Sequence, residues 1–335
     1  MRAVIYRETG PSGVLQVVDR PIAEPGPDEV RVRVHLSGVN PTDWKAREGG
    51  GRPAPFPEVV PNQDGSGVID AVGPGVDPAR VGERVWIWEA AYRRADGTAQ
   101  EYVVLPSVQA VGLPDSASFE LGASLGIPFL TAHRCLTVNE GGPERLAPGA
   151  LDGRTVLVAG GAGAVGNAAI QLARWAGASV IATVSSPAKA QLAKAAGANE
   201  VIDYRAQDVV AEIRAISARG VDTIVEVAAA NAAIDAAVIG LHGTVAIYAS
   251  GGGDLTLPVR PLLAPNARWQ FVLVYTLPDA AKIAGIEAVR AAVADGALRV
   301  GDEAGLPLHH FPLEQAAAAH DAVQAGAVGK VLIDL

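Results

Sequence analysis

The chain has 335 residues, of which 49% are hydrophobic and 19% are charged. This length predicts roughly two domains, and the apolar content is enough to build a core in each, which excludes disorder as the dominant state. The formal net charge of −9 argues against a broad surface for nucleic acid or acidic membranes, because such surfaces need clustered Lys and Arg.

The number of cysteines limits the possible disulfides and metal sites, and the first residues of the chain indicate its cellular compartment. The one cysteine, Cys135, excludes an internal disulfide and a zinc site built from several thiolates. Residues 1–10 lack the apolar core of a signal peptide, and no later run reaches the about 18 apolar residues of a membrane span. We therefore expect a soluble, cytoplasmic protein without a membrane partner.

The first third of the chain is β-rich. Between residues 29 and 40, Val30, Val32 and Val34 alternate with polar residues, which is the period of a half-buried strand. Further short strands are expected at residues 67–71, 84–88 and 101–105, with Gly and Pro between them. This pattern predicts a small, partly open β-barrel with many turns.

From residue 155 onward, apolar strands alternate with helical segments. We expect strands at 155–159, 180–184, 201–204, 223–227, 244–249 and 269–275, and helices at 164–176, 187–196, 207–218 and 231–239. The strands are continuous apolar runs, so both of their faces should be covered. They predict the parallel sheet of a doubly wound α/β domain.

The last part of the chain is too short to fold alone. It contains a predicted helix at 279–294, another at 313–325 and a closing strand at 330–335. We expect this part to return to the first domain. The predicted boundaries are therefore residues 1–125, completed by 277–335, for the first domain and 126–276 for the second.

A glycine-rich turn follows the first predicted strand of the second domain. Gly161, Gly163 and Gly166, with Ala164 and Val165 between the last two, fit the pattern G-x-G-x-x-G. Small residues let the backbone approach a pyrophosphate, which then lies at the positive end of the next helix. We predict that these five residues bind a dinucleotide; the alternative is an ordinary strand–helix turn.

The next strand bears on the choice of cofactor. An NAD site usually has Asp or Glu at the end of this strand for the ribose diol, but no acidic residue occurs between Asp152 and Glu200. The side chains available instead are Ser185, Ser186, Lys189 and Tyr204. This set would bind a 2′-phosphate that a carboxylate would repel, so we predict NADPH as the cofactor. The alternative is that Lys189 is a solvated helix residue and that Tyr204 only packs against its strand.

Several motifs along the chain resemble a known family. They are MRAV (1–4), SGVNPTD (37–43), GSGVIDAVGPGV (65–76), GERV (82–85), GIPFLTAHRCL (126–136), GAVGNAAIQLA (163–173) and GKVLIDL (329–335). Their order resembles the medium-chain dehydrogenase/reductase superfamily and, within it, the zinc-free quinone oxidoreductases of the ζ-crystallin type. Enoyl reductases share most of these motifs. The resemblance implies a GroES-like first domain, a Rossmann second domain and a nicotinamide ring in the cleft between them.

The ligand sets of the zinc-dependent relatives are absent. Zinc-dependent alcohol dehydrogenases of this superfamily carry a Cys where this chain has Ser37, and a Gly-His-Glu where it has Asn62-Gln63-Asp64. The four-cysteine structural lobe is also missing. We therefore expect no metal, and hydride transfer from NADPH to an acceptor that is already electrophilic, such as a quinone or an α,β-unsaturated carbonyl.

The histidines do not replace these ligands. His133 and His320 lie on helical segments without Cys or a carboxylate at ligand spacing, and His309 and His310 are expected in a turn.

The resemblance also implies residues near the nicotinamide. The Asn and Thr that match Asn40 and Thr131 lie there in the family, and we further expect Ser250 and Lys330 to bind the cofactor. Asn40 ends a strand and could bond to the ribose, the carboxamide or a substrate carbonyl. The alternatives are a turn residue ahead of Pro41 for Asn40 and, for Thr131, a helix residue bonded to its own backbone.

One position departs from the family pattern. Quinone reductases of this type often carry Tyr-Ile-Arg-Ser-Gly after the Asn-containing segment, and here Lys45 replaces that Tyr. Lys45 could polarise a carbonyl or give it a proton, which makes it a candidate catalytic residue with Asn40 and Thr131. The alternative is a solvated lysine on a short helix.

Two other functions and an assembly remain open. An enoyl-thioester reductase would use basic residues for the thioester arm, for which Arg47, Arg52, Arg93 and Arg94 are candidates. A non-catalytic NADPH-binding protein would retain the glycine turn without turnover. Residues 268–275 form an apolar edge strand that predicts a homodimer.

Overall fold

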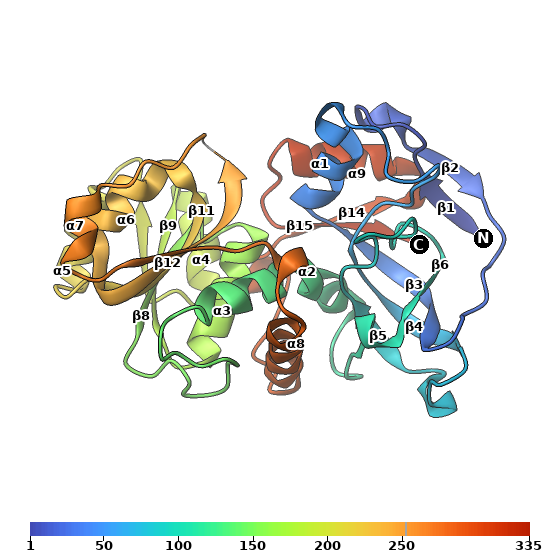
Figure 1. The fold of residues 1–335 in the computed structure, drawn as a ribbon, viewed down its shortest axis with the longest axis horizontal. Helices are drawn as coiled ribbons and strands as arrows, with labels where there is room; N and C mark the ends of the chain where they lie inside the picture. The colour runs from blue at the N-terminus through green and yellow to red at the C-terminus, as the bar shows by residue number, and fades with distance from the viewer. Residues whose placement is uncertain (252) are drawn as a thin grey trace. The chain divides into compact units, whose positions relative to one another are not determined.

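The computed structural model of the protein describes residues 1–251 and 253–335, apart from the side chain of Ser250. The chain folds into two compact units, which are drawn in Figure 1. Unit 1 comprises Met1–Ile127 and Pro307–Leu335, and unit 2 comprises Pro128–Leu306.

The last part of the chain rejoins unit 1 at residue 307, later than the predicted residue 277. The difference arises because helix α8 (Asp279–Ala294) packs within unit 2. A Cβ placed on Gly285 of this helix would lie 3.2 Å from Leu130 and 3.3 Å from His133, both on helix α2 (Phe119–Leu136). The small residue therefore allows close helix–helix packing.

Unit 1 is built on a seven-stranded sheet in the order β14-β15-β3-β4-β5-β7, with β6 also paired to β3. Its strands are β3 (Glu29–Val39), β4 (Asp64–Val72), β5 (Arg84–Ile87), β6 (Tyr102–Pro106), β7 (Ala110–Gly112), β14 (Leu308–Pro312) and β15 (Lys330–Asp334). A separate antiparallel pair consists of β1 (Arg2–Ile5) and β2 (Gln16–Asp19). Helices α1 (Pro41–Glu48) and α9 (Ala316–Gln324) complete the unit.

Strand β3 shows how the sequence pattern sets burial in unit 1. Val30, Val32 and Val34 are buried while Arg33 is exposed, as the alternation predicts. From Leu36 onward every residue of β3 is buried. Antiparallel neighbours β15 and β4 flank this half on both edges, and apolar residues of α2 and α9 share core clusters with Leu36 and Val39. Polar side chains at this end are therefore removed from water.

Unit 2 is a six-stranded parallel sheet in the order β10-β9-β8-β11-β12-β13. Its strands are β8 (Thr155–Ala159), β9 (Ser179–Val184), β10 (Glu200–Asp203), β11 (Val221–Ala228), β12 (Ile239–Gly251) and β13 (Arg268–Phe271). Its helices are α3 (Ala164–Trp175), α4 (Pro187–Ala195), α5 (Val209–Ile216), α6 (Ala232–Val238), α7 (Val259–Leu263) and α8. The predicted α/β class with a doubly wound parallel sheet is confirmed.

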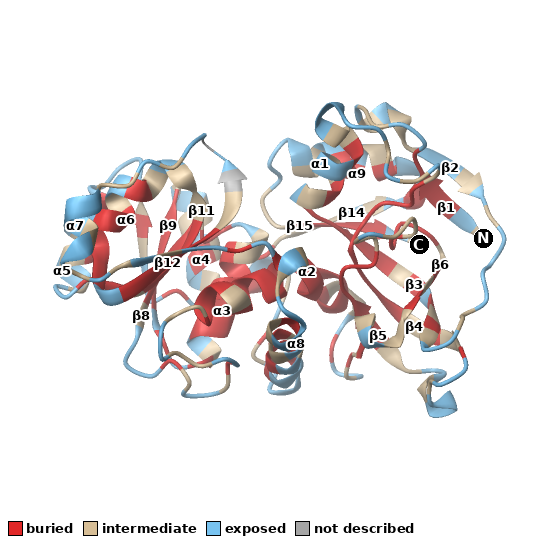
Figure 2. Ribbon diagram, in the orientation of Figure 1, coloured by how far each residue is buried: buried red, intermediate tan, exposed pale blue. Residues whose placement is uncertain are grey.

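The core of unit 2 lies on the central strands, which are coloured as buried in Figure 2. Leu157, Ile181 and Ile224 are at most 2% exposed. They belong to one apolar cluster with Val245. Continuous apolar strands are needed here because helices cover both faces of a parallel sheet.

Three predicted segments differ from the structure, one of which is the strand expected at 244–249, part of the longer β12. The strand expected at 269–275 ends at Phe271, and a 3-10 turn follows at Val274–Thr276, because β13 has a sheet neighbour on one side only. The predicted turn at His309 and His310 is wrong: both lie in β14, which pairs in parallel with β15. His310 Nδ1 lies 2.7 Å from Asp334 Oδ1 across this pair.

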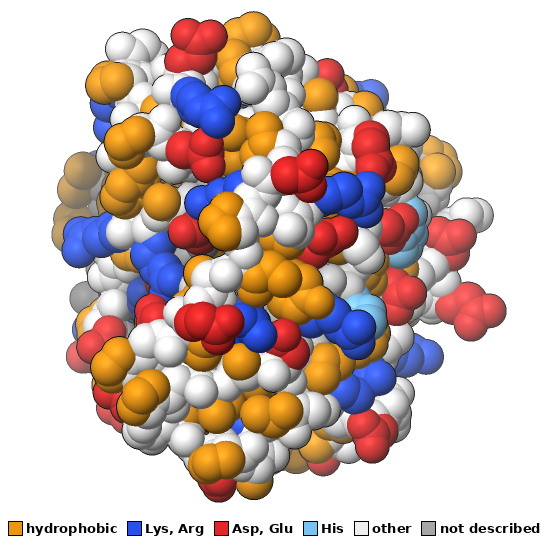
Figure 3. Space-filling view, turned by 90° about the vertical axis from the view of Figure 1, so that its right-hand side faces the viewer, with side chains coloured by type: hydrophobic (Ala, Val, Ile, Leu, Met, Phe, Trp, Pro, Cys, Tyr) orange, Lys and Arg blue, Asp and Glu red, His pale blue; other side chains and the backbone are white. Residues whose placement is uncertain are grey.

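The surface of unit 1 carries both signs of charge. On the face shown in Figure 3, Asp and Glu side chains are interspersed with Lys and Arg. Arg20, for example, lies 2.6 Å from Asp96 and 3.2 Å from Glu58. Within the described residues, every helix is too short or too polar to span a membrane.

Candidate functional site

The glycine turn of unit 2 joins β8 to α3. Gly163 is the N-cap of α3 and provides no side chain to cap it, so the first backbone N–H groups of the helix are left for another acceptor. Gly163 is exposed, and Ala164 and Val165 in the first helical turn are half-buried. The turn therefore presents a helix N-terminus with an open approach, which is the geometry that binds phosphate groups.

The glycines of this turn have different structural roles. A Cβ on Gly166 would overlap the carbonyl oxygen of Gly160, and a Cβ on Gly161 would lie 2.8 Å from the Cβ of Ala182. A Cβ on Gly163 would meet only Gly160 O, at 3.5 Å. Gly161 and Gly166 thus allow the chain to pack on itself, whereas the space beside Gly163 is free for a ligand.

The end of β9 brings three of the predicted phosphate-binding residues together. Lys189 Nζ donates to Ser185 Oγ at 3.1 Å, and Ser186 Oγ accepts from the backbone N–H of Lys189 at 3.3 Å as the N-cap of α4. Tyr204 follows β10, its N–H bonds to Val184 O at 3.0 Å, and its side chain is 50% exposed. The four side chains therefore lie at the ends of two neighbouring parallel strands.

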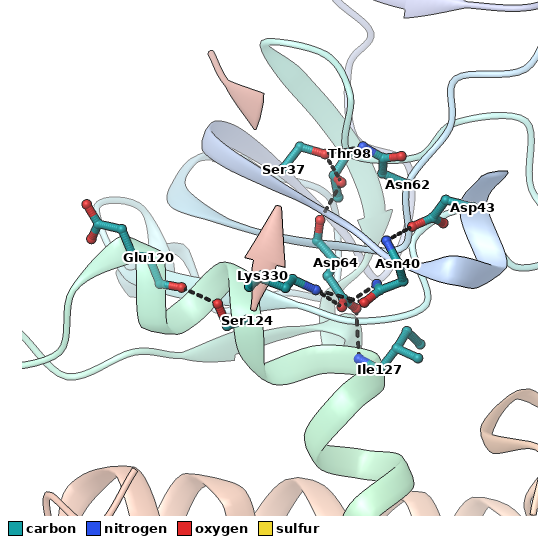
Figure 4. Close-up of polar contacts among 10 residues, drawn as sticks. All are labelled: Ser37, Asn40, Asp43, Asn62, Asp64, Thr98, Glu120, Ser124, Ile127 and Lys330. Carbon is teal, nitrogen blue, oxygen red and sulfur yellow. Dashed lines mark hydrogen bonds and ion pairs between the residues drawn. The ribbon is translucent and has the colours of Figure 1, made fainter. Parts of the chain in front are cut away.

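A buried polar cluster in unit 1 surrounds Asn40, as Figure 4 shows. Asn40 Nδ2 donates to Asp64 Oδ2 at 2.7 Å, and Lys330 Nζ donates to Asn40 Oδ1 at 2.8 Å and to Asp64 Oδ2 at 3.2 Å. Asp64 Oδ1 accepts from the N–H of Ile127 at 2.8 Å. The side chains of Lys330 and Asp64 are 1% and 0% exposed.

The sheet register brings this cluster together. Val331 of β15 pairs with Val39 of β3 in antiparallel register, so Lys330 comes level with Asn40. Gly38 pairs with Asp64 on the other edge of β3. Burial raises the pKa of Asp64, while the charge of Lys330 and the bond from Asn40 oppose that rise by stabilising the carboxylate.

A chain of hydrogen-bonded amide and hydroxyl groups ends at the backbone oxygen of Asp64. Asn62 Nδ2 donates to Ser37 Oγ at 2.9 Å, Ser37 Oγ lies 2.7 Å from Thr98 Oγ1, and Thr98 Oγ1 donates to the backbone oxygen of Asp64 at 2.5 Å. Asn62 Oδ1 lies 3.1 Å from His320 Nε2. Because Asn62 Oδ1 is an acceptor only, His320 donates through Nε2.

The sequences of both units have clear relatives. The family model described as zinc-binding dehydrogenase matches residues 164–300, and that described as alcohol dehydrogenase GroES-like domain matches residues 26–115. A quinone oxidoreductase of Rattus norvegicus is 30% identical over 99% of this chain and 97% of its own length. The chain belongs to the quinone oxidoreductase family of medium-chain dehydrogenases/reductases.

Solved structures of this superfamily share the fold. A protein described as an NAD-dependent alcohol dehydrogenase is 32% identical, with a TM-score of 0.85 and complete coverage of both chains. A mycobacterial protein complexed with NADPH is 29% identical, with a TM-score of 0.80 and complete coverage of both chains. The protein is thus an oxidoreductase with the GroES-like and Rossmann-type domains of this family.

At the positions where zinc-dependent members of the superfamily carry Cys and Gly-His-Glu, this chain has Ser37 and Asn62-Gln63-Asp64. Ser37 and Asp64 occupy these positions, and both are already engaged by the groups just described. The Lys330 ammonium lies against the Asp64 carboxylate, where its positive charge opposes a bound cation. Among the described residues, no group of three or more His, Cys, Asp or Glu is placed to hold a metal ion.

The remaining predicted residues lie elsewhere or outside the description. Lys45 is exposed on α1, with its ammonium 5.6 Å from the centre of the Trp44 ring. Thr131 is buried on α2 within unit 2, and the side chain of Ser250 is outside the described part of the chain. Asn40 and Lys330 are brought together, whereas Lys45 is not part of their cluster; the catalytic and cofactor-binding roles of these residues remain predictions.

Buried acidic groups were not singled out in the sequence. Burial raises the pKa of Asp43 to about 8, with a further contribution from Asp64, although Asp43 accepts from the Asn40 N–H at 2.7 Å. In unit 2, burial and the neighbouring Glu226 raise the pKa of Asp235 to about 9. Glu226 is an acidic residue inside the apolar stretch of β11, and this is the sequence signal that would have identified the Glu226–Asp235 pair.

Two residues next to Tyr204 were also missed. Asp203 ends β10 level with Val184, but its Oδ1 accepts from the N–H of Arg205 at 3.0 Å in a local turn. Arg205 is exposed and adds a positive charge beside Tyr204. The sequence signal was the basic residue directly after a strand end, which is where cofactor phosphates bind in doubly wound sheets.

Proposed function

We propose that the protein is an NADPH-dependent reductase that transfers hydride, without zinc, to quinones or to activated α,β-unsaturated carbonyls. The observation that carries the proposal is the grouping of Ser185, Ser186 and Lys189 at the end of the strand after an open glycine turn. A hydroxyl and an ammonium in hydrogen-bond contact bind a phosphate oxygen by charge-assisted bonds. NADPH carries that extra phosphate and NADH does not.

The residues present fit this cofactor. The helix N-terminus at Gly163 would hold the pyrophosphate, and Ser185 with Lys189 would hold the 2′-phosphate. Bound NADPH supplies the hydride. The protein supplies the binding groups and, in the cluster around Asn40, polar groups that are already oriented before a ligand arrives.

The choice of acceptor follows from the cluster at Asp64. A simple ketone is a weak hydride acceptor that needs a Lewis acid or a proton donor at its oxygen. At Asp64 the Lys330 ammonium already binds the carboxylate that a metal ion would need. Quinones and enones carry their own electron-withdrawing groups, so they accept hydride with hydrogen-bond assistance alone. This chemistry favours them over unactivated ketones.

Two observations bear on the enoyl-thioester alternative. Arg47 is fully buried and donates to Gln324 at 3.1 Å, so it is not available to a thioester arm. Arg94 is half-buried and donates to Val104 O, which leaves Arg52 and Arg93 as the exposed candidates. The engagement of Arg47 and Arg94 supports small quinones and enones over an enoyl thioester as the substrates.

The test is a turnover assay with the purified protein. NADPH is mixed with a panel of quinones, enones and a 2-enoyl thioester, and the NADPH absorbance is followed. We expect oxidation with quinones or enones at a kcat/KM above that for the thioester. An absorbance that never falls, with cofactor fluorescence still changing on binding, would support a non-catalytic NADPH-binding protein instead.

A further inference from the structure

The side-chain amide of Asn40 is held at both ends. Its oxygen accepts from the Lys330 ammonium at 2.8 Å, and its nitrogen donates to Asp64 at 2.7 Å. An Asn side chain can be rotated by half a turn at little cost when its partners can both donate and accept, as hydroxyl groups can. Here rotation would place an N–H against an ammonium and an oxygen against a carboxylate, so a single orientation is favoured.

The chain makes room for the two groups that enforce this orientation. A Cβ on Gly38 would lie 2.9 Å from Lys330 Cε, and a Cβ on Gly126 would overlap Asp64 Oδ1. Both charged side chains are almost completely buried, which strengthens their interaction with the amide dipole. A buried ion pair is costly to form, and it is retained here in direct contact with a predicted catalytic residue.

We propose that Lys330 and Asp64 are positioning residues that fix Asn40 as a hydrogen-bond donor towards the reacting carbonyl. Nδ2 carries two hydrogens, one of which is bound by Asp64, and the described residues give no acceptor for the other. This inference rests on the proposed function. When hydride adds to the β-carbon of an enone, the C=C π electrons form a new double bond to the carbonyl carbon and the C=O π electrons move to the oxygen. The free N–H stabilises this enolate oxygen until water protonates the enolate.

The same geometry assigns Lys330 a different role from the predicted cofactor contact. Its ammonium is bound to Asn40 and Asp64 inside unit 1 and is 1% exposed. Lys330 therefore acts through Asn40 and does not need to touch the cofactor.

The test uses the full-length protein with Lys330→Met, which keeps the side-chain volume and removes the ammonium. We expect kcat for quinone reduction to fall about tenfold or more, because an oriented donor is lost. The Kd for NADPH, measured by fluorescence, should stay within threefold. With NADPH deuterated at the transferred position, the isotope effect on kcat should rise, because the hydride step becomes slower.

A second variant separates positioning from stability. Lys330→Met leaves the Asp64 carboxylate buried and unpaired, so the fold itself could fail. In the double variant Lys330→Met/Asp64→Asn no charge is left without a partner, and we expect thermal stability to recover while kcat stays low. A double variant with wild-type kcat would overturn the proposal.

Lys282→Met is the matched control. Lys282 is another buried lysine, 9% exposed, whose Nζ donates to Tyr275 O in unit 2. Its loss should lower stability without raising the isotope effect. Equal changes in the isotope effect for both lysine variants would show that the effect is a general consequence of destabilisation, which would overturn the proposal.

A readout without turnover keeps this proposal distinct from the proposed function. The side-chain amide signal of Asn40 in ¹⁵N-labelled protein, identified by its loss in Asn40→Ser, should exchange slowly with solvent and lose that protection in Lys330→Met. If the wild-type protein oxidises no NADPH, the proposed function fails, and unprotected exchange in wild type would then overturn the positioning role independently.

Discussion

The glycines of the turn between β8 and α3 have different structural roles. Gly166 lies against the backbone of Gly160, whereas Gly163 faces open space at the start of α3. The sequence motif treats the two glycines alike, because both are written as G. The structure distinguishes a glycine needed for packing from one that leaves the start of α3 open.

Substitution by alanine tests this distinction. Gly166→Ala should lower the free energy of unfolding by about 1–3 kcal/mol, because the added methyl group overlaps the Gly160 carbonyl. Gly163→Ala should change stability by less than about 0.5 kcal/mol, since Gly163 has a φ of −81° and its Cβ is unobstructed. It should nevertheless weaken NADPH binding at least several-fold.

Denaturant unfolding and fluorescence titration measure the two effects. Equal loss of stability in both variants would contradict the assignment of packing to Gly166 alone. Unchanged NADPH affinity in Gly163→Ala would contradict the assignment of ligand approach to Gly163.

Lys189 is the residue on which cofactor choice should depend. A charge-assisted bond contributes about 1.5–3 kcal/mol, so Lys189→Ala should lower kcat/KM for NADPH roughly tenfold to a hundredfold. The kcat/KM for NADH should change little, because NADH has no 2′-phosphate. Lys194→Ala is the control, since Lys194 is exposed near the end of the same helix. Equal losses with both cofactors would argue against a 2′-phosphate contact.

At the scale of elements, the end of the parallel sheet is where the structure departs most from the predicted pattern. Strand β13 is short, lies at the edge of the sheet and has one neighbour, β12. Phe271 at its end is 64% exposed and Leu273 beyond it is 55% exposed. An unpaired edge with exposed apolar side chains tends to pair with another strand.

We predict a homodimer that uses this edge. Wild-type protein should have twice the monomer mass by light scattering, and Phe271→Glu should shift it to the monomer, because burying an unpaired carboxylate at an interface is unfavourable. Val108→Glu is the control: Val108 is 71% exposed in unit 1, so its substitution should leave the dimer intact. A monomeric wild-type mass would contradict the prediction.

For the molecule as a whole, buried carboxyl groups tie stability to pH. Asp43 in unit 1 and Asp235 in unit 2 have pKa values of about 8 and about 9 in the folded protein, whereas an unfolded Asp titrates near ~4. Between these values the folded state binds more protons than the unfolded state. The stability that these groups contribute is therefore complete below about pH 4 and is lost as the pH rises through 8 to 9.

Asp235→Asn tests this dependence. A neutral amide removes the repulsion with Glu226 that ionisation creates, so the variant should be more stable than wild type at pH 10, by on the order of 3 kcal/mol. At pH 5 the two should differ little. Thermal melts across pH 5–10 measure this, with Asp115→Asn, whose side chain is fully exposed, as the control. A constant difference at all pH values would contradict a titrating Asp235.

The sequence by itself determined the class of fold and the place of the glycine-rich turn. Alternating and continuous apolar runs encode which faces of a strand are covered, and a glycine motif between a strand and a helix is local in the chain. The first four expected strands of unit 2 were found within two residues of their predicted bounds. The prediction that the chain is an oxidoreductase of this family is also confirmed. Backbone preferences and the periodic burial of apolar side chains depend on a few neighbouring residues, so a local sequence pattern contains enough information to predict the elements.

Only the tertiary structure decided which groups surround Asn40. Lys330 lies 290 residues from Asn40 along the chain, and Asp64 lies 24 residues from it. They meet because β15 and β4 pair with opposite edges of β3, in a register that follows from the whole sheet. The partner of a buried charge depends on such long-range pairing, and no local pattern of residue types specifies it.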